Sequence, residues 1–589
     1  MKKKYYLTLL SCAIFSAFTS CTDILDEENH SILTPDFFGT VQGFESGLTA
    51  AYAGFRSIYG PEEGLHALTN VGTDDFRTAN SNRTTNVATY ASSFNASNEF
   101  SRHLWNNAYR QINTCNGLIS NAGNLSGISE AEKKRMVGEA KFLRAQYYFL
   151  LVQTFGDLTL NKEFITSPET GATRTDILEV YKLIVDDLIE AKGTLPDSPK
   201  TANVLPGKAT AAAAQHLLAK VYLTLAWVHN KNTDLHTTGN YHQKYYDAAK
   251  AQEYFQLAYD ESTQLLNKAA SMNIGLLPDF RDIWKPKNEN NQEVLWNVQY
   301  ASGYTDYGGG YPLNHLYVTA YTDIMEERNV NDGRCYVWFR ASDWMLNTCF
   351  ADKVNDSRYE GTFQTVWYAT KTTGDKLFYA KLEGQDYQMI GRLNEVGDTA
   401  IWMPGYNMTK QEVESHMLGR GEGKNVYWLI TPEMYTNKLF PTMKKYLDPD
   451  RKHYNDNGMR PIIVYRLGET YLIAAEAALM MNRKADALKY VNELRMRAAY
   501  TGHEEAMKVT EADLDLDFIL DERARELAAE HTRWFDLVRT GKLMERVQKY
   551  DDYDGYRNIK WFHNIRPIPQ EQIDRVITGE PYPQNEGWY

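Results

Sequence analysis

Helical periodicity at both ends of the chain is the feature that most restricts its fold. Apolar residues recur there at the three- and four-residue spacing of amphipathic helices, whereas the middle of the chain lacks this pattern. The spacing predicts a mostly α protein with helices over Val41–Tyr59, Ser101–Ala122, Glu130–Phe155, Asp176–Leu195, Lys208–Val228, Ala248–Lys268, Gly468–Met481, Lys484–Ala498 and Asp517–Arg539.

Two alanine-rich stretches indicate how these helices pack. Short turns separate the helices, with Pro206-Gly207 between two of them and Gly541 after the last, and Asp176 is placed to cap the helix that begins at Ile177. Small side chains allow neighbouring helices to approach closely, which favours helical hairpins stacked in the tetratricopeptide manner. No strict 34-residue period is present, so this prediction depends on helix pairing. The small residues are Ala209, Ala211–Ala214, Ala219, Ala474, Ala475, Ala477 and Ala478.

The central part of the chain has a different composition. From about residue 278 to residue 461, Gly, Asn, Asp and Tyr become frequent, and Glu293–Gln299 is typical of a strand. We therefore expect a single domain over residues 21–589. Its helical scaffold covers about 30–277 and 462–589, and a loop-rich insert with short strands covers about 278–461.

The first residues are typical of a secreted lipoprotein. Lys2, Lys3 and Lys4 precede a short apolar run that ends before Cys21, which predicts a signal peptide over residues 1–20. Phe18-Thr-Ser-Cys21 resembles a bacterial lipobox, so Cys21 is the predicted lipid attachment residue, and acyl chains would anchor the protein without a transmembrane helix. The alternative is an ordinary secreted protein with an incidental cysteine.

Charge and cysteine content argue against a nucleic-acid-binding protein and against a disulfide-stabilised one. The formal net charge of −13 at pH 7 would repel nucleic acid and anionic lipid, and it suits neutral ligands. The few cysteines do not form a disulfide framework.

Many short motifs, in one order, resemble a known family. An acidic stretch after Cys21 is similar to the export tag of surface lipoproteins of the Bacteroidetes, although a solvated linker is the alternative. The other motifs include Trp105-Asn-Asn-Ala-Tyr109, Gly138-Glu-Ala-Lys-Phe-Leu-Arg144, Tyr465-Arg-Leu-Gly468-Glu469, Glu522-Arg-Ala-Arg-Glu526 and Arg533-Trp-Phe-Asp536. Over nearly the whole chain, this pattern resembles the SusD/RagB outer-membrane nutrient-binding lipoproteins of Bacteroidetes.

The resemblance implies what the protein does and with what it works. It implies a SusD-like, cell-surface lipoprotein that captures oligosaccharide or polysaccharide and delivers it to a TonB-dependent transporter of the SusC type in the outer membrane. Some members are thought to serve peptide import, so a peptide-binding lipoprotein is the first alternative. A lipid-anchored glycoside hydrolase is the second.

A sugar site needs exposed aromatic rings beside planar hydrogen-bonding side chains. The segment from Tyr300 to Tyr311 is the first candidate, because Gly308–Gly310 cannot supply core packing, although about half of its tyrosines are expected in the core. The loop Thr73–Asn98 is the second candidate. The predicted ligand-binding residues are Tyr300, Tyr304, Tyr307, Tyr311, Arg77, Asn80, Arg83, Tyr90, Phe94 and Trp284, with Trp338, Trp344, Trp367 and Trp402 as further possibilities.

The sequence contains no motif for catalysis or metal binding. There is no His-Glu-x-x-His, no paired Cys-x-x-Cys and no Gly-x-Ser-x-Gly, so we expect no catalytic residue, no metal ligand and no cofactor. Charged residues on apolar helices are instead expected to form internal ion pairs that hold the hairpins together. These residues are Glu139, Arg144, Arg466, Glu469 and Glu476.

Overall fold

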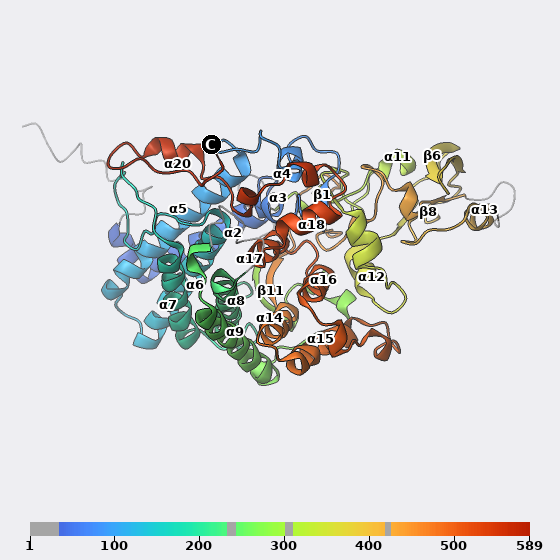
Figure 1. Ribbon diagram of the computed structural model, residues 1–589. Helices are drawn as coiled ribbons and strands as arrows, with labels where there is room; N and C mark the ends of the chain where they lie inside the picture. The colour runs from blue at the N-terminus through green and yellow to red at the C-terminus, as the bar shows by residue number, and fades with distance from the viewer. Residues whose placement is uncertain (1–34, 232–242, 301–309, 419–425, 589) are drawn as a thin grey trace, which may run out of the picture.

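The computed structural model describes residues 35–231, 243–300, 310–418 and 426–588. In Figure 1 the helical scaffold fills the left and the bottom of the view, and the insert extends to the right. Cys21, Tyr304 and Tyr307 lie outside the described residues.

Consecutive helices of the N-terminal part pack side by side. The order is α2 (Val41–Tyr59), α5 (Glu99–Asn121), α6 (Glu130–Phe155), α7 (Ile177–Thr194), α8 (Ala211–His229) and α9 (Ala248–Lys268). Each contacts the next in this order, as helical hairpins do in a stack, so the predicted helical-hairpin scaffold is confirmed.

The C-terminal helices extend the same stack. The helix α14 (Leu467–Met480) packs against α9, and it also contacts α15 (Lys484–Ala498) and α16 (Leu516–Glu526). Alanine makes this close packing possible, because Ala474, Ala475 and Ala478 are fully buried. Segments that lie about 200 residues apart in the sequence therefore belong to one scaffold.

One predicted helix is two helices in the structure. The prediction of a single helix over Asp517–Arg539 is wrong, because α16 ends at Glu526 and α17 (Arg533–Arg539) begins seven residues later. Between them Ala529 and His531 both have φ of 62°, which no α-helix allows. The break places the Glu530 carboxylate beside Arg466 and Lys445, at 2.8 and 2.7 Å. The other eight predicted helices are confirmed, with bounds within three residues.

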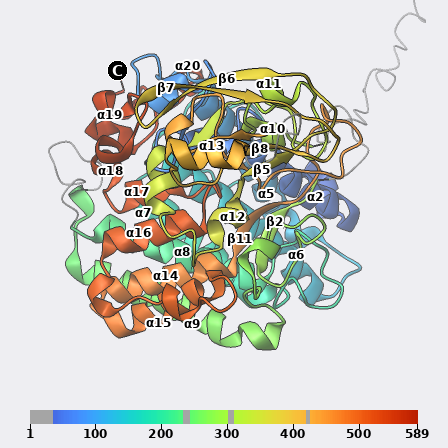
Figure 2. The same cartoon turned by 90° about the vertical axis from the view of Figure 1, so that its right-hand side faces the viewer.

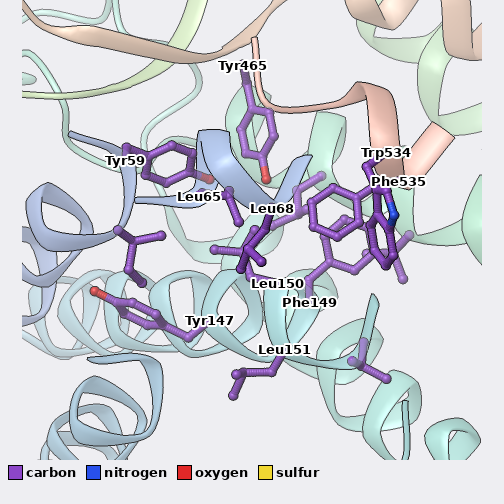
Figure 3. Packing of buried hydrophobic residues seen from close by; sticks show 14 of the residues in the cluster. Tyr59, Leu65, Leu68, Tyr147, Phe149, Leu150, Leu151, Tyr465, Trp534 and Phe535 are labelled. Atoms are coloured by element: carbon purple, nitrogen blue, oxygen red, sulfur yellow. The ribbon is translucent and has the colours of Figure 1, made fainter. Parts of the chain in front are cut away.

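The two halves of the chain share one hydrophobic core. Figure 3 shows Tyr59 of α2, Leu65 and Leu68 of α3 (Leu65–Thr69), Tyr147 of α6 and Trp534 of α17 meeting in the interior. Because this core joins helices from both ends of the sequence, neither half of the scaffold can bury its apolar face alone.

The insert carries short strands and a core of its own. The predicted strand is confirmed as β2 (Val294–Val298), which pairs with β11 (Ile462–Arg466) and contacts α2 and α8. Beyond it, β5 (Val366–Tyr368), β8 (Thr399–Trp402) and β9 (Trp428–Leu429) form a small sheet. The neighbouring hairpin of β6 (Lys376–Leu382) and β7 (Gln385–Gly391) lies at the upper edge of Figure 2. A second group of buried apolar residues, mostly from residues 318–440, fills this part.

The stretch Thr73–Asn98 is not the exposed loop that its composition suggests. It contains β1 (Phe76–Thr78) and α4 (Thr85–Thr89), and most of residues 73–90 are buried. The strand β1 pairs with β3 (Phe339–Ala341) of the insert, in antiparallel register. This pairing joins the N-terminal scaffold to the insert and leaves few of the predicted ligand-binding residues at the surface.

Buried ion pairs connect the elements, as predicted. Arg144 binds Asp187 at 2.8 Å, which ties α6 to α7, and Lys208 binds Glu139 at 2.9 Å. Glu469 accepts from Lys220 and Arg523, at 2.8 and 3.0 Å, and Glu476 binds Arg539. These carboxylates hold separate helices together, so the interpretation of these residues as structural is confirmed.

The predicted cap of α7 gives a first testable result. The Asp176 side chain accepts a hydrogen bond from the Leu178 N–H at 3.0 Å and another from the Tyr245 hydroxyl at 2.7 Å. Asp176→Ala is expected to lower the free energy of unfolding by about 1–2 kcal/mol, because a helix N-terminus loses its cap. Chemical denaturation measures the change. Asp186→Ala on the same helix is the control, since Asp186 is more than half exposed, and an equal loss in both variants would contradict the prediction.

Candidate functional site

Three separate segments meet at one surface of the molecule. The turn Gly60–Gly64 follows α2 and lies next to Tyr300, whose hydroxyl donates to the Arg56 carbonyl at 3.2 Å. The same turn carries Glu62 and Glu63, which bind Arg83 from the second candidate segment. The structure therefore brings one residue from each predicted segment to a common turn.

Arg83 is the centre of this surface. Its guanidinium lies 2.7 Å from Glu62, 2.5 Å from Glu63 and 3.0 Å from Glu99, and 35% of its side chain is exposed. Hydrogen bonds to Glu99 and Glu63 raise the pKa of Arg83 above its ordinary value, so its charge is permanent. All three nitrogens of the guanidinium donate to carboxylates, which fix it in position, while about a third of the side chain stays open to a ligand.

Trp338 lies beneath Arg83. The guanidinium carbon of Arg83 is 5.3 Å from the centre of the Trp338 ring, a cation–π contact, and the ring of Tyr336 follows at 6.4 Å. Both rings are half-buried. Backbone hydrogen bonds from Ala79 to Trp338 (2.7 Å) and from Asn80 to Val337 (2.8 Å) fix this strip, and the Asn80 side chain is exposed beside it.

The chemistry of this surface fits a sugar. The exposed parts of these rings can contact the C–H faces of a pyranose, while the guanidinium, amide and carboxylate groups can exchange hydrogen bonds with hydroxyls. We call it the Arg83–Trp338 surface. It consists of Tyr300, Glu62, Glu63, Asn80, Arg83, Tyr336 and Trp338.

Several residues predicted to face a ligand belong to the core instead. Tyr311 is 1% exposed and contacts Gly458. The Tyr90 hydroxyl donates to the Gly72 carbonyl at 2.5 Å, and the Phe94 ring meets the Trp588 ring edge-on at 5.4 Å. In this arrangement none of the three rings has a free face, because each is enclosed by a distant segment.

Two further predicted residues are also buried. Arg77 forms an ion pair with Asp552 at 2.8 Å, so it serves the junction of β1 with the C-terminal segment. Trp284 is 8% exposed and lies under the Lys445 ammonium, 4.6 Å from the ring centre. Trp344 and Trp367 are buried as well, whereas Trp402 is half-buried and lies against His416.

The sequence provided no strong signal for three members of the surface. Tyr336, Glu62 and Glu63 lie outside both candidate segments, and only the fold brings them to Arg83. Trp338 was a further possibility whose exposure could not be derived from its neighbours in the sequence.

In the described ranges there is no group of three His, Cys, Asp or Glu side chains arranged to hold a metal ion. No helix in the described part of the chain is both long and apolar enough to cross a membrane.

Comparison with known proteins identifies relatives of the whole chain. Residues 255–588 match the model of the SusD family, and residues 23–223 match a family described as starch-binding and associating with the outer membrane. SusD-like protein P25 of Formosa agariphila is 25% identical over 584 residues, which cover 95% of this chain and 94% of the relative. The starch-binding protein SusD of Bacteroides thetaiotaomicron is 25% identical over 475 residues, covering 78% and 74%.

A solved structure shares the fold. The surface glycan-binding protein A of Bacteroides thetaiotaomicron, in complex with laminarihexaose, superposes with a TM-score of 0.65 at 17% identity, and covers 93% of this chain and 100% of its own. The family model spans more than half of the residues, and the motifs between Trp105 and Asp536 that suggested the resemblance lie in the scaffold just described. The chain belongs to the SusD family.

Proposed function

We propose that this protein is a cell-surface glycan-binding lipoprotein that captures oligosaccharide and delivers it to a SusC-like, TonB-dependent transporter of the outer membrane. The observation that carries the proposal is the pair of half-buried rings, Tyr336 and Trp338, beside Arg83 and Asn80 in a SusD-family chain. Two relatives support the ligand class, because one is named as starch-binding and the other was solved with laminarihexaose.

The anchor is part of the same proposal. Cys21 follows a basic and then apolar N-terminal segment, and acylation there would hold the chain at the membrane. Mass spectrometry of the N-terminal peptide of the mature protein tests this step. An acylated Cys21 is expected, and an unmodified peptide that begins elsewhere would contradict the anchor without affecting the ligand class.

The ligand class and its site can be tested together. Residues 22–589, which contain every described element, are screened on a glycan array and by affinity electrophoresis in polysaccharide gels. Trp338→Ala is expected to weaken binding to the best glycan at least tenfold, since the variant loses an aromatic face at the centre of the surface. Trp402→Ala is the matched control, because Trp402 is also a half-buried tryptophan of the insert but lies in the β5–β8–β9 sheet.

Three outcomes would contradict the proposal in different ways. Equal binding by both variants and the wild type would move the site away from the Arg83–Trp338 surface. Binding of peptide pools without any glycan would replace the ligand class. Release of reducing sugar by the purified protein would make it a hydrolase.

Co-purification of the lipoprotein with a TonB-dependent transporter from detergent-solubilised membranes tests the partner.

A further inference from the structure

A cleft lies within the insert, away from the Arg83–Trp338 surface. Its volume is about 630 Å³, which is within the range of roughly 300–1,000 Å³ typical of small-molecule sites. The walls include α12 (Arg358–Thr362) and β5, which are visible near the middle of Figure 2, together with the segment after Phe280. The cleft shares no lining residue with the Arg83–Trp338 surface.

Most charges that line this cleft are already paired. Arg281 binds Asp279 and Glu360, at 2.7 and 3.0 Å, and Lys285 binds Asp282 at 2.5 Å. Arg460 lies 2.5 Å from Glu289.

The remaining acid of the cleft is held by amides. Both oxygens of the Asp332 carboxylate accept hydrogen bonds at 2.6 Å, one from Asn329 and the other from Gln364. Asp279, Asp282 and Glu360 are therefore paired with cations, whereas the buried Asp332 carboxylate is held by neutral amides and keeps its charge.

Lys444 is the exception. Among the described residues that line the cleft, it is the one cation whose side chain has neither an ion pair nor a hydrogen bond. It is half-buried, and burial lowers the pKa of its ammonium, although the charge of Glu360 opposes this shift. A half-buried ammonium without a partner gains from any anionic ligand atom that reaches it, because its desolvation is then compensated.

The cleft also offers an aromatic face and amides. The Tyr368 side chain at the end of β5 is 59% exposed, and the exposed Asn331 lines the same wall. An exposed phenol ring can contact the C–H face of a sugar ring, while the Asn331 amide can bind a hydroxyl group. A cation, an exposed ring and an amide in one open cleft match a sugar ring that carries a carboxylate.

We propose that this cleft is a second saccharide site that takes a uronic acid unit, with the ligand carboxylate on Lys444 and the sugar ring on Tyr368. The net negative charge of the protein acts against anions at long range, but salt screens it beyond about 8–10 Å, so the charges within the cleft determine whether an anion binds. The inference rests on the proposed function only in assigning a saccharide as the ligand, and it concerns a different part of the molecule.

The test compares one ligand with and without its charge. Calorimetric titration of residues 22–589 uses oligogalacturonate and its fully methyl-esterified form, which keeps the rings and loses the carboxylate charge. Wild type is expected to prefer the acid. Lys444→Gln is expected to weaken binding of the acid at least tenfold and of the ester less than twofold, whereas Lys444→Arg keeps the charge and most of the affinity.

Matched variants separate the cleft from general charge effects. Lys285→Gln removes a cation of the same cleft that is already paired and 65% exposed, so it is expected to change affinity less than twofold. Tyr368→Ala is expected to weaken binding of both forms. Thermal unfolding confirms that each variant is folded. The inference would be overturned if the wild type did not bind oligogalacturonate or did not prefer it to the ester. It would also be overturned if Lys444→Gln and Lys285→Gln weakened binding equally.

The same titrations distinguish this inference from the proposed function. Trp338→Ala is expected to lose the glycan found on the array and to keep oligogalacturonate. Binding of the array glycan without binding of the acid would overturn only the cleft. If Trp338→Ala still binds the acid and the wild type binds no other glycan, the cleft remains a supported site. The Arg83–Trp338 surface is then not a glycan site.

Discussion

Replacing Arg466 with methionine is expected to lower the free energy of unfolding by about 3–5 kcal/mol. Arg466 is 1% exposed, and its guanidinium binds Glu293 at 3.0 Å, Glu526 at 2.6 Å and Glu530 at 2.8 Å. The variant therefore leaves three buried carboxylates short of a cation. Arg497 still binds Glu293 and Glu526, and Lys445 still binds Glu530, which keeps the loss within this range.

The control for this variant is a pair of the same chemistry at the surface. Arg483 is 41% exposed, and its guanidinium lies 4.0 Å from Asp486, so Arg483→Met is expected to cost less than about 1 kcal/mol. Denaturant titration followed by circular dichroism measures both variants. A loss below about 1 kcal/mol for Arg466→Met, or equal losses for the two, would show that the buried cluster does not stabilise the scaffold.

The second large effect is a loss of folding stability at acidic pH. Burial opposes ionisation of Glu526, but the guanidinium groups of Arg497, Arg466 and Arg358 outweigh it and lower the pKa of Glu526 from 4.5 to about 2. A carboxyl whose pKa is lowered in the folded state stabilises that state above its unfolded pKa, and this contribution is lost as the pH falls through the folded pKa. Glu526 is thus expected to contribute about 3 kcal/mol at pH 6, and the contribution disappears between about pH 4.5 and pH 2.

The pKa of Asp74 is lowered in the folded protein, in the same direction as that of Glu526. Burial again raises its pKa, yet Arg533 and Arg546 outweigh burial and lower it below its ordinary value. Asp74 binds both guanidiniums, and so joins the segment before β1 to α17 and α18 (Leu543–Tyr550). Protonation of Asp74 in acid should therefore weaken the contact between the N-terminal segment and the C-terminal helices.

A variant isolates the contribution of Glu526. The wild type and Glu526→Gln are unfolded with denaturant at pH 6 and at several values down to pH 2. The difference in their free energies of unfolding is expected to narrow by about 3 kcal/mol over this range, because protonated Glu526 resembles glutamine. A difference that stays constant with pH would mean that the pKa of Glu526 is not lowered in the folded protein.

Local patterns determined most of the scaffold. Helix bounds follow from apolar spacing, the start of α7 from the Asp176 side chain, and close helix packing from alanines. The break between α16 and α17 did not follow, because it depends on Arg466 and Lys445, which lie about 60 to 90 residues earlier and bind Glu530. Helical periodicity continues across this break in the sequence, so no local signal reveals it.

The fold class, the family and the internal pairing of the charged helix residues could be predicted from the sequence. Which aromatic rings a ligand can reach became known from the packing of the chain. Tyr311 and Phe94 lie in the core because Gly458 and Trp588 cover them, whereas Trp338 is only half-buried beside Arg83. Helix formation depends on residues three and four positions apart, while the exposure of a ring depends on whichever distant segment packs against it.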